Sequence, residues 1–127
     1  MHLKYVHLTI ARNPGEDIPE DEYDQRYLIT APLTPEGHID ETLWRDHKDK
    51  CEARHITAGR ADRIGKLTRR GGAWRLHYPG DAPSDDEMLF HLDTHKFLPG
   101  EYVTVSEPDG DVFTYRIARV EKGPRIA

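Results

Sequence analysis

Apolar and polar side chains alternate along most of the chain, as they do in half-buried β-strands. The first such segment is YVHLTIAR at residues 5–12, where valine, leucine and isoleucine alternate with polar neighbours. A second segment, QRYLITAPL at residues 25–33, must end near Pro32 because prolines cannot sit inside a strand ladder. The alternation returns later in RIGKLT, AWRLHY, MLFHLD, EYVTVS and VFTYRIARV. The pattern predicts a mainly β protein.

Turn-forming residues separate these segments and indicate how they connect. The two glycines of RRGG tolerate the positive φ that a tight hairpin needs, so RIGKLT and AWRLHY are expected to pair. EPDG predicts the turn of a closing hairpin, in which Val103 and Val105 point inward. The apolar alternation slips between Ile117 and Ala118 and resumes at Val120, which predicts a β-bulge there.

One segment has helical spacing instead. ETLWRDHKDKCEARHI contains no glycine or proline, and Asp40 before it is a suitable N-cap. Trp44, His47, Cys51 and His55 would share one side of this helix. We therefore expect one α-helix at about residues 40–55. The whole chain, residues 1–127, is predicted to be a single domain with a small, strongly curved antiparallel sheet or barrel of six to eight short strands, mainly β and at the margin α+β.

Composition limits the cellular compartments and the classes of partner that we expect for this chain. Cys51 is the only cysteine, so no disulfide within the chain is possible. The first residues do not resemble a signal peptide, and no apolar run approaches the roughly 20 residues of a membrane span. We expect a reduced, cytoplasmic protein without a membrane partner. The net charge of −5 disfavours nucleic acid as the main partner.

A candidate metal site lies in the segment FHLDTHKF. If the strand continues to residue 95, His91, Asp93 and His95 project from one face, with His77 on the neighbouring hairpin as a fourth member. Two imidazoles and a carboxylate are suitable ligands for zinc. The alternative is an ordinary solvent-facing side of a strand, because Met88 and its apolar partners Phe90 and Leu92 would form the buried side. That structural interpretation is preferred.

The expected helix face offers a second candidate. Cys51 with His47 or His55 could bind a metal, or an imidazole could lower the pKa of the thiol for nucleophilic chemistry. A free cysteine more often packs as a small apolar side chain, here with Trp44 as its anchor. The acids of SDDE before the MLFHLD strand could likewise hold a cation, or simply face solvent or the basic hairpin.

A basic stretch with aromatic residues is the third candidate. Residues 54–75 hold seven Lys or Arg against one acid, and Arg69, Arg70 and Arg75 are interleaved with Trp74 and Tyr78. Such a surface could follow a phosphate backbone while a ring stacks on a base. Against this, the two rings are expected on the core face of their strand. The same residues, together with Trp44, could line a groove between sheet and helix.

The motifs of common nucleotide-binding and hydrolytic enzymes do not occur in the chain. The succession WRDHKDKC, RRGGAW, DDE and HKFLPGEYVTV followed by GDVFTYRIARV resembles a family of small uncharacterised bacterial proteins, mostly proteobacterial, from Tyr27 to Val120. This resemblance implies no activity, because none is assigned to the family.

These observations predict a non-catalytic binding or interaction module that needs no cofactor and takes a protein or small-molecule ligand. The alternatives are a metal-dependent enzyme or metal-binding protein built on His91, Asp93 and His95, and a nucleic-acid-binding barrel that uses residues 60–75.

Overall fold

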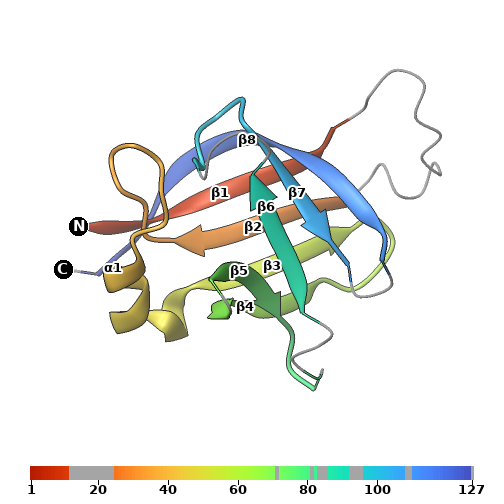
Figure 1. The fold of residues 1–127 in the computed structure, drawn as a ribbon, viewed down its shortest axis with the longest axis horizontal. Helices are drawn as coiled ribbons and strands as arrows, with labels where there is room; N and C mark the ends of the chain where they lie inside the picture. The colour runs from red at the N-terminus through yellow and green to blue at the C-terminus, as the bar shows by residue number, and fades with distance from the viewer. Residues whose placement is uncertain are drawn as a thin grey trace.

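The computed structural model describes residues 1–11, 25–70, 72–80, 82, 86–91, 96–107 and 110–126. It confirms a mainly β fold: eight antiparallel strands follow one another around a closed barrel, and the last strand pairs with the first (Figure 1). The strands are β1 His2–Ile10, β2 Gln25–Ala31, β3 Glu52–Thr57, β4 Arg63–Arg70, β5 Ala73–His77, β6 Glu87–His91, β7 Tyr102–Ser106 and β8 Val112–Arg125.

Both predicted hairpins are present. β4 and β5 pair up to Arg70 and Ala73, which leaves two residues for the turn, and Gly72 there has a φ of 77°. β7 and β8 pair from Ser106 and Val112 back to Tyr102 and Arg116. Val103 and Val105 are fully buried, as their alternation predicted.

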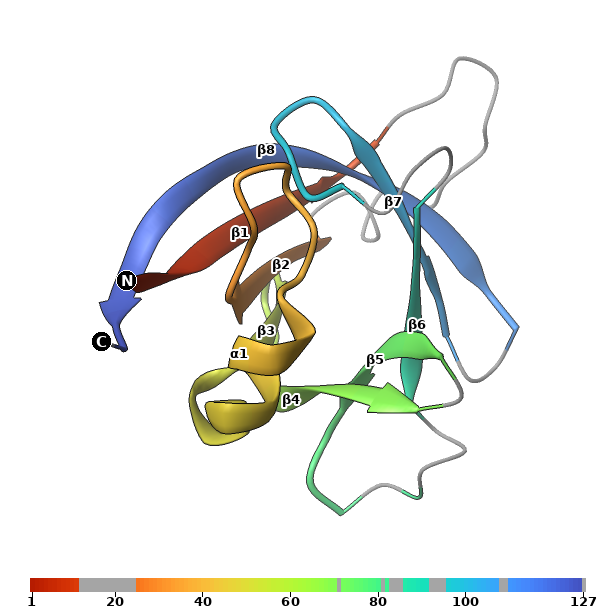
Figure 2. The same ribbon diagram turned by 60° about the vertical axis from the view of Figure 1, so that its left-hand side comes forward.

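The bulge predicted after Ile117 is also present, in the longest strand. His7 pairs with Arg119 while Leu8 pairs with Ile117, so Ala118 is an extra residue in β8. A second register shift lies between the pairs His2–Arg125 and Lys4–Lys122. Bulges bend a strand and increase its twist, and Figure 2 shows β8 curving around the outside of β1.

The core fills the inside of the barrel. Among the described residues, all eight strands contribute buried apolar side chains: three each from β1 and β2, two each from β7 and β8, and one each from β3, β4, β5 and β6. The largest completely buried ones are Tyr27, Tyr115, Leu3, Leu8, Ile29, Leu67, Leu76 and Ile117. Burying an aliphatic or aromatic side chain of this size contributes about 1.5–3 kcal/mol, so this interior is the main source of stability.

The helix starts where expected but is much shorter. Asp40 accepts a hydrogen bond from the Leu43 backbone N–H, and α1 spans Glu41–Asp46. A 3-10 turn, η2 Lys48–Lys50, follows, and the chain then enters β3. The expectation of a helix to about residue 55 is therefore wrong. The segment CEARHIT also alternates with a period of two, and as an extended chain it buries Cys51, Ala53 and His55 inside the barrel. This strand pattern prevails over the helical spacing of the same residues.

Helix α1 packs beside one end of the barrel (Figure 2). The indole N–H of Trp44 donates to the Leu67 backbone oxygen at 2.9 Å, and its ring meets Trp74 edge to face with centroids 5.0 Å apart. The loop before the helix is fixed by a hydrogen bond from the Phe97 N–H to the Gly37 oxygen at 2.6 Å. Trp44 and Phe97 are both buried, so apolar side chains cover this end.

One glycine gives a direct test of the close packing of strands. A Cβ on Gly65 in β4 would collide with the backbone oxygen of His77 and the ring of Tyr78. We expect Gly65→Ala to lower the free energy of unfolding by about 1–3 kcal/mol, because the neighbouring backbone must shift. Urea unfolding measures the change. The adjacent Ile64, which is 46% exposed, is the control: Ile64→Ala should stay within about 0.5 kcal/mol, and equal losses in both variants would contradict the packing argument.

Candidate functional site

A cluster of polar side chains lies inside the barrel at the end away from α1. Gln25 begins β2, Glu87 begins β6, and Tyr78 directly follows β5, whereas α1 follows the other end of β2. Glu87 is only 3% exposed. The Tyr27 hydroxyl donates to one of its carboxylate oxygens at 2.7 Å, and the Tyr78 hydroxyl donates to the other.

The neighbouring polar groups form a second hydrogen-bonded set, which meets the first through aromatic ring contacts. The His55 ring stacks on Tyr27 with centroids 4.3 Å apart, and its Nε2 lies 2.9 Å from Oε1 of Gln25. The Tyr115 hydroxyl also donates to Gln25 Oε1, at 3.4 Å. An amide oxygen that accepts both bonds requires the tautomer of His55 with its proton on Nε2.

Burial sets the protonation state of this cluster. It raises the pKa of Tyr27 and of Tyr78 well above that of a free phenol, and the negative charge of Glu87 raises both pKa values further. Burial also lowers the pKa of His55, and Arg63 acts in the same direction while Glu87 opposes it. At neutral pH the phenols therefore remain donors and the imidazole is neutral.

This network departs from the expected alternation. MLFHLD was expected to turn Met88 inward and leave the acids and imidazoles in water, but among the β6 side chains that the structure describes Glu87 and Leu89 are buried and Met88 is half-buried. That expectation is wrong at Glu87 and at Leu89. The physical reason is that two tyrosine hydroxyls from other strands satisfy the carboxylate, so its burial is compensated by hydrogen bonds. The cluster is consistent with a structural role.

The candidate metal residues are only partly within the described residues. Asp93, His95 and the side chain of His91 lie outside them. His77 places its Nδ1 2.6 Å from Oδ1 of Asp86. Among the residues that the structure describes, no group of three or more His, Cys, Asp or Glu side chains is arranged to hold a metal ion. Zinc binding by these residues stays a prediction.

Cys51 does not share a helix with His47 and His55, because it lies between the 3-10 turn η2 and the first residue of β3. Cys51 is completely buried, and burial raises the pKa of its thiol to about 11. A protonated, inaccessible thiol is a poor nucleophile and a poor metal ligand. This geometry favours the packing interpretation, with Trp44 in the same core cluster.

The aromatic and basic residues of the third candidate have local partners. Trp44 and Trp74 contact each other, and Arg69 lies over the Trp74 ring and 3.6 Å from Glu41. Tyr78 is buried and bonded to Glu87, while the Arg75 Nε donates to the Arg70 backbone oxygen. The Trp44–Trp74 and Arg69–Glu41 contacts join α1 to β4 and β5, whereas Tyr78 belongs to the polar cluster at the other end of the barrel. Ligand binding or nucleic-acid binding by these residues stays a prediction.

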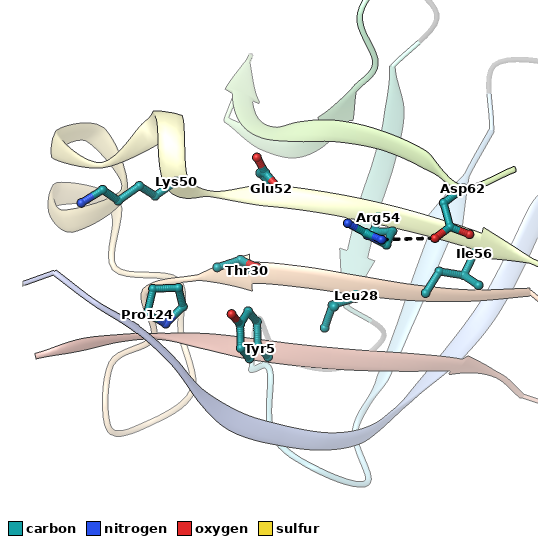
Figure 3. Close-up of a pocket in the computed structure, with 9 residues that line it drawn as sticks. All are labelled: Tyr5, Leu28, Thr30, Lys50, Glu52, Arg54, Ile56, Asp62 and Pro124. Atoms are coloured by element: carbon teal, nitrogen blue, oxygen red, sulfur yellow. Dashed lines mark hydrogen bonds and ion pairs between the residues drawn. The ribbon is translucent and has the colours of Figure 1, made fainter.

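A different site, absent from the predicted residues, lies on the outer face of β1, β2 and β3. There the structure has a hollow of about 410 Å³, which we call the β3 hollow (Figure 3). Its lining combines apolar with charged side chains: Tyr5, Leu28, Thr30, Lys50, Glu52, Arg54, Ile56, Asp62 and Pro124. Arg54 and Asp62 form an ion pair at 3.3 Å on its rim, as Figure 3 shows.

A second hollow of about 380 Å³, the β8 hollow, adjoins the first through Leu28 and Ile56. Its lining residues are His7, Leu8, Thr9, Arg26, Tyr27, Leu28, Ile56, Ala118 and Arg119. The bulge in β8 helps to build it, because two consecutive residues, Ala118 and Arg119, are both exposed and both line the hollow. Without the bulge, one of the two would point inward.

Sequence reasoning missed these hollows, although a weak signal existed. In YLI of β2, Tyr27 and Ile29 point inward, so Leu28 between them must place an apolar side chain on the outer face. Ile56 does the same beside the buried His55. Register then brings the two close, because Arg26 pairs with Ile56 and Leu28 with Arg54. The pairing of distant strands could not be deduced from the chain alone.

The buried carboxylate supports a stability prediction. Tyr78→Phe removes one donor to Glu87 and leaves a buried charged oxygen without that partner, so we expect a loss of about 1–3 kcal/mol in the free energy of unfolding. Combining Tyr78→Phe with Glu87→Leu removes both partners, and the double variant should lose less than the sum of the two single variants. Strict additivity in urea unfolding would show that the hydrogen bond contributes nothing.

The lowered pKa of His55 supports a pH prediction. In the unfolded chain this imidazole takes up a proton near its ordinary pKa of about 6.5, whereas the folded protein resists protonation. The contribution of His55 is therefore complete above pH 6.5 and is lost as the pH falls below that value. Urea unfolding at pH 7.5 and pH 5.5 should show a smaller decrease in stability for His55→Gln than for the native chain. Equal decreases would rule out His55 as a contributor.

Comparisons with known proteins found no relative of this chain. A scan of protein-family models, a search of curated proteins and a search of solved structures each return no match. The resemblance to small bacterial proteins therefore stays a prediction. No helix in the described part of the chain is long and apolar enough to cross a membrane.

Proposed function

We propose that the protein is a non-catalytic binding module that takes a small ligand in the two adjoining hollows on the outside of its barrel. The observation that carries the proposal is the β3 hollow, which combines an apolar floor at Leu28 and Ile56 with a charged rim (Figure 3). Its volume of about 410 Å³ lies within the roughly 300–1,000 Å³ of small-molecule sites.

The rim of the β3 hollow is held by contacts between neighbouring strands. Arg54 pairs with Asp62 at 3.3 Å, and Lys66 bonds both to Glu52 at 3.3 Å and to the Asp49 backbone oxygen at 2.7 Å. Exposed ion pairs contribute little to stability, but they orient the side chains around the floor. Leu28 and Ile56 are half-buried, so a ligand would remove further apolar surface from water.

The barrel interior supports binding on the outside in preference to chemistry inside. The Glu87 carboxylate already accepts hydrogen bonds from the hydroxyls of Tyr27 and Tyr78, and the His55 imidazole is already bonded to Gln25. A general base must reach a proton of its substrate, and a buried group with satisfied partners must first lose them. We further propose a cytoplasmic location, for which a single, buried cysteine is the supporting feature.

A neutral apolar probe tests the proposed site. We expect 4-phenylbutan-1-ol to shift the amide resonances of Leu28, Ile56 and their neighbours in a ¹⁵N-labelled protein. Ile56→Gln should weaken binding about tenfold, because it removes apolar contact area of the floor. The matched control is Ile64→Gln, an exposed isoleucine on β4 outside both hollows. Shifts confined to other strands, or equal losses in the two variants, would contradict the proposal.

A further inference from the structure

The β8 hollow differs from the β3 hollow in its charge. Two arginines, Arg26 and Arg119, line it together with His7, and none of the lining residues within the described part of the chain is acidic. The β3 hollow is lined by charged side chains of both signs. Lys50 and Arg54 are basic, and Glu52 and Asp62 are acidic. An elongated ligand lying over the shared floor would therefore meet a basic end and an electrically mixed end.

The arginines of the β8 hollow are available to a ligand. Arg26 is exposed, and within the described ranges it forms no ion pair. Arg119 bonds to Glu121 at 2.7 Å, but the side chains are 65% and 47% exposed. Such a surface pair contributes at most about 1 kcal/mol, so a ligand oxyanion can share or replace Glu121 at small cost. Guanidinium groups bind carboxylates with two parallel hydrogen bonds.

The His7 imidazole lies beside this basic wall, and its Nε2 atom is buried. His7 pairs with Arg119 on β8 and with Leu28 on β2, so it lies between the basic wall and the apolar floor. Its Nε2 atom has no hydrogen-bond partner among the described residues, and Glu121 is 3.7 Å away. Neighbouring Cα atoms of paired strands are about 5 Å apart, which places Arg119 and Leu28 about 10 Å apart across His7.

We propose that the β8 hollow binds the carboxylate of a small amphipathic organic acid, whose apolar body lies over Leu28 and Ile56 toward Tyr5 in the β3 hollow. This inference rests on the proposed function and adds to it the chemical class of the ligand. An aryl- or alkyl-carboxylate fits the sequence of features along the floor: a charged head at Arg26 and Arg119, then apolar surface, then an aromatic ring.

Three probes with one apolar body and different head groups test the inference. 4-Phenylbutyrate, 4-phenylbutan-1-ol and 4-phenylbutylamine are titrated into ¹⁵N-labelled protein. We expect the carboxylate to bind about tenfold more tightly than the alcohol and the amine to bind most weakly, with shifts at Leu28 and Ile56. Equal affinities of carboxylate and alcohol overturn the inference but leave the proposed function intact. Failure of all three probes to shift these amides overturns both.

Variants with opposite expected effects identify the residues responsible. Arg26→Gln combined with Arg119→Gln should reduce the carboxylate preference to about threefold or less without weakening the alcohol, whereas Arg70→Gln, an exposed arginine outside both hollows, should preserve it. Glu121→Gln should strengthen carboxylate binding about two- to threefold, because it releases Arg119 and removes a negative charge. A carboxylate preference that survives in the double arginine variant, or that Glu121→Gln lowers, overturns the inference.

Discussion

The hydrogen bonds to Glu87 hold together the part of the barrel where backbone pairing is weakest. In the described residues, β5 and β6 share two register pairs, Arg75–Met88 and Leu76–Glu87, while every other pair of neighbouring strands shares at least four. Glu87 bonds to Tyr78, just after β5, and to Tyr27 across the interior on β2. His77 and Asp86 add a contact on the outside of the same seam. Side-chain hydrogen bonds thus add to the few backbone pairs between β5 and β6 and help to keep the barrel closed.

Ring closure in turn depends on β8, and the irregularities of that strand shape its surroundings. The extra residue at Ala118 lets Ile117 stay in the core while Arg119 reaches the outer surface. The second register shift brings Pro124 to the far rim of the β3 hollow (Figure 3). The outer hollows therefore arise from the same bulges that wrap a fourteen-residue strand around the barrel. A straight β8 would leave the floor formed by Leu28 and Ile56 without its basic wall.

Local patterns in the sequence were sufficient for much of this fold. RRGG marked a hairpin, and the slip after Ile117 marked a bulge, because each depends on adjacent residues. The failures involve residues that are distant in the chain. His55 satisfied a helical pattern but became part of a strand, and Glu87 was placed in water because its partner Tyr27 is 60 residues away. The hollows were missed for the same reason: Tyr5, Lys50 and Pro124 meet only after the strands have paired.

The pairing of β1 with β8 has a consequence for recognition. Open sheets offer an unpaired outer strand to which a foreign peptide can add its own backbone, as in β-augmentation. Here each strand already has two neighbours, from the first pair around to the last. A binding partner must therefore recognise side chains, and substitutions on the outer surface can retune its specificity without disturbing the backbone ladder.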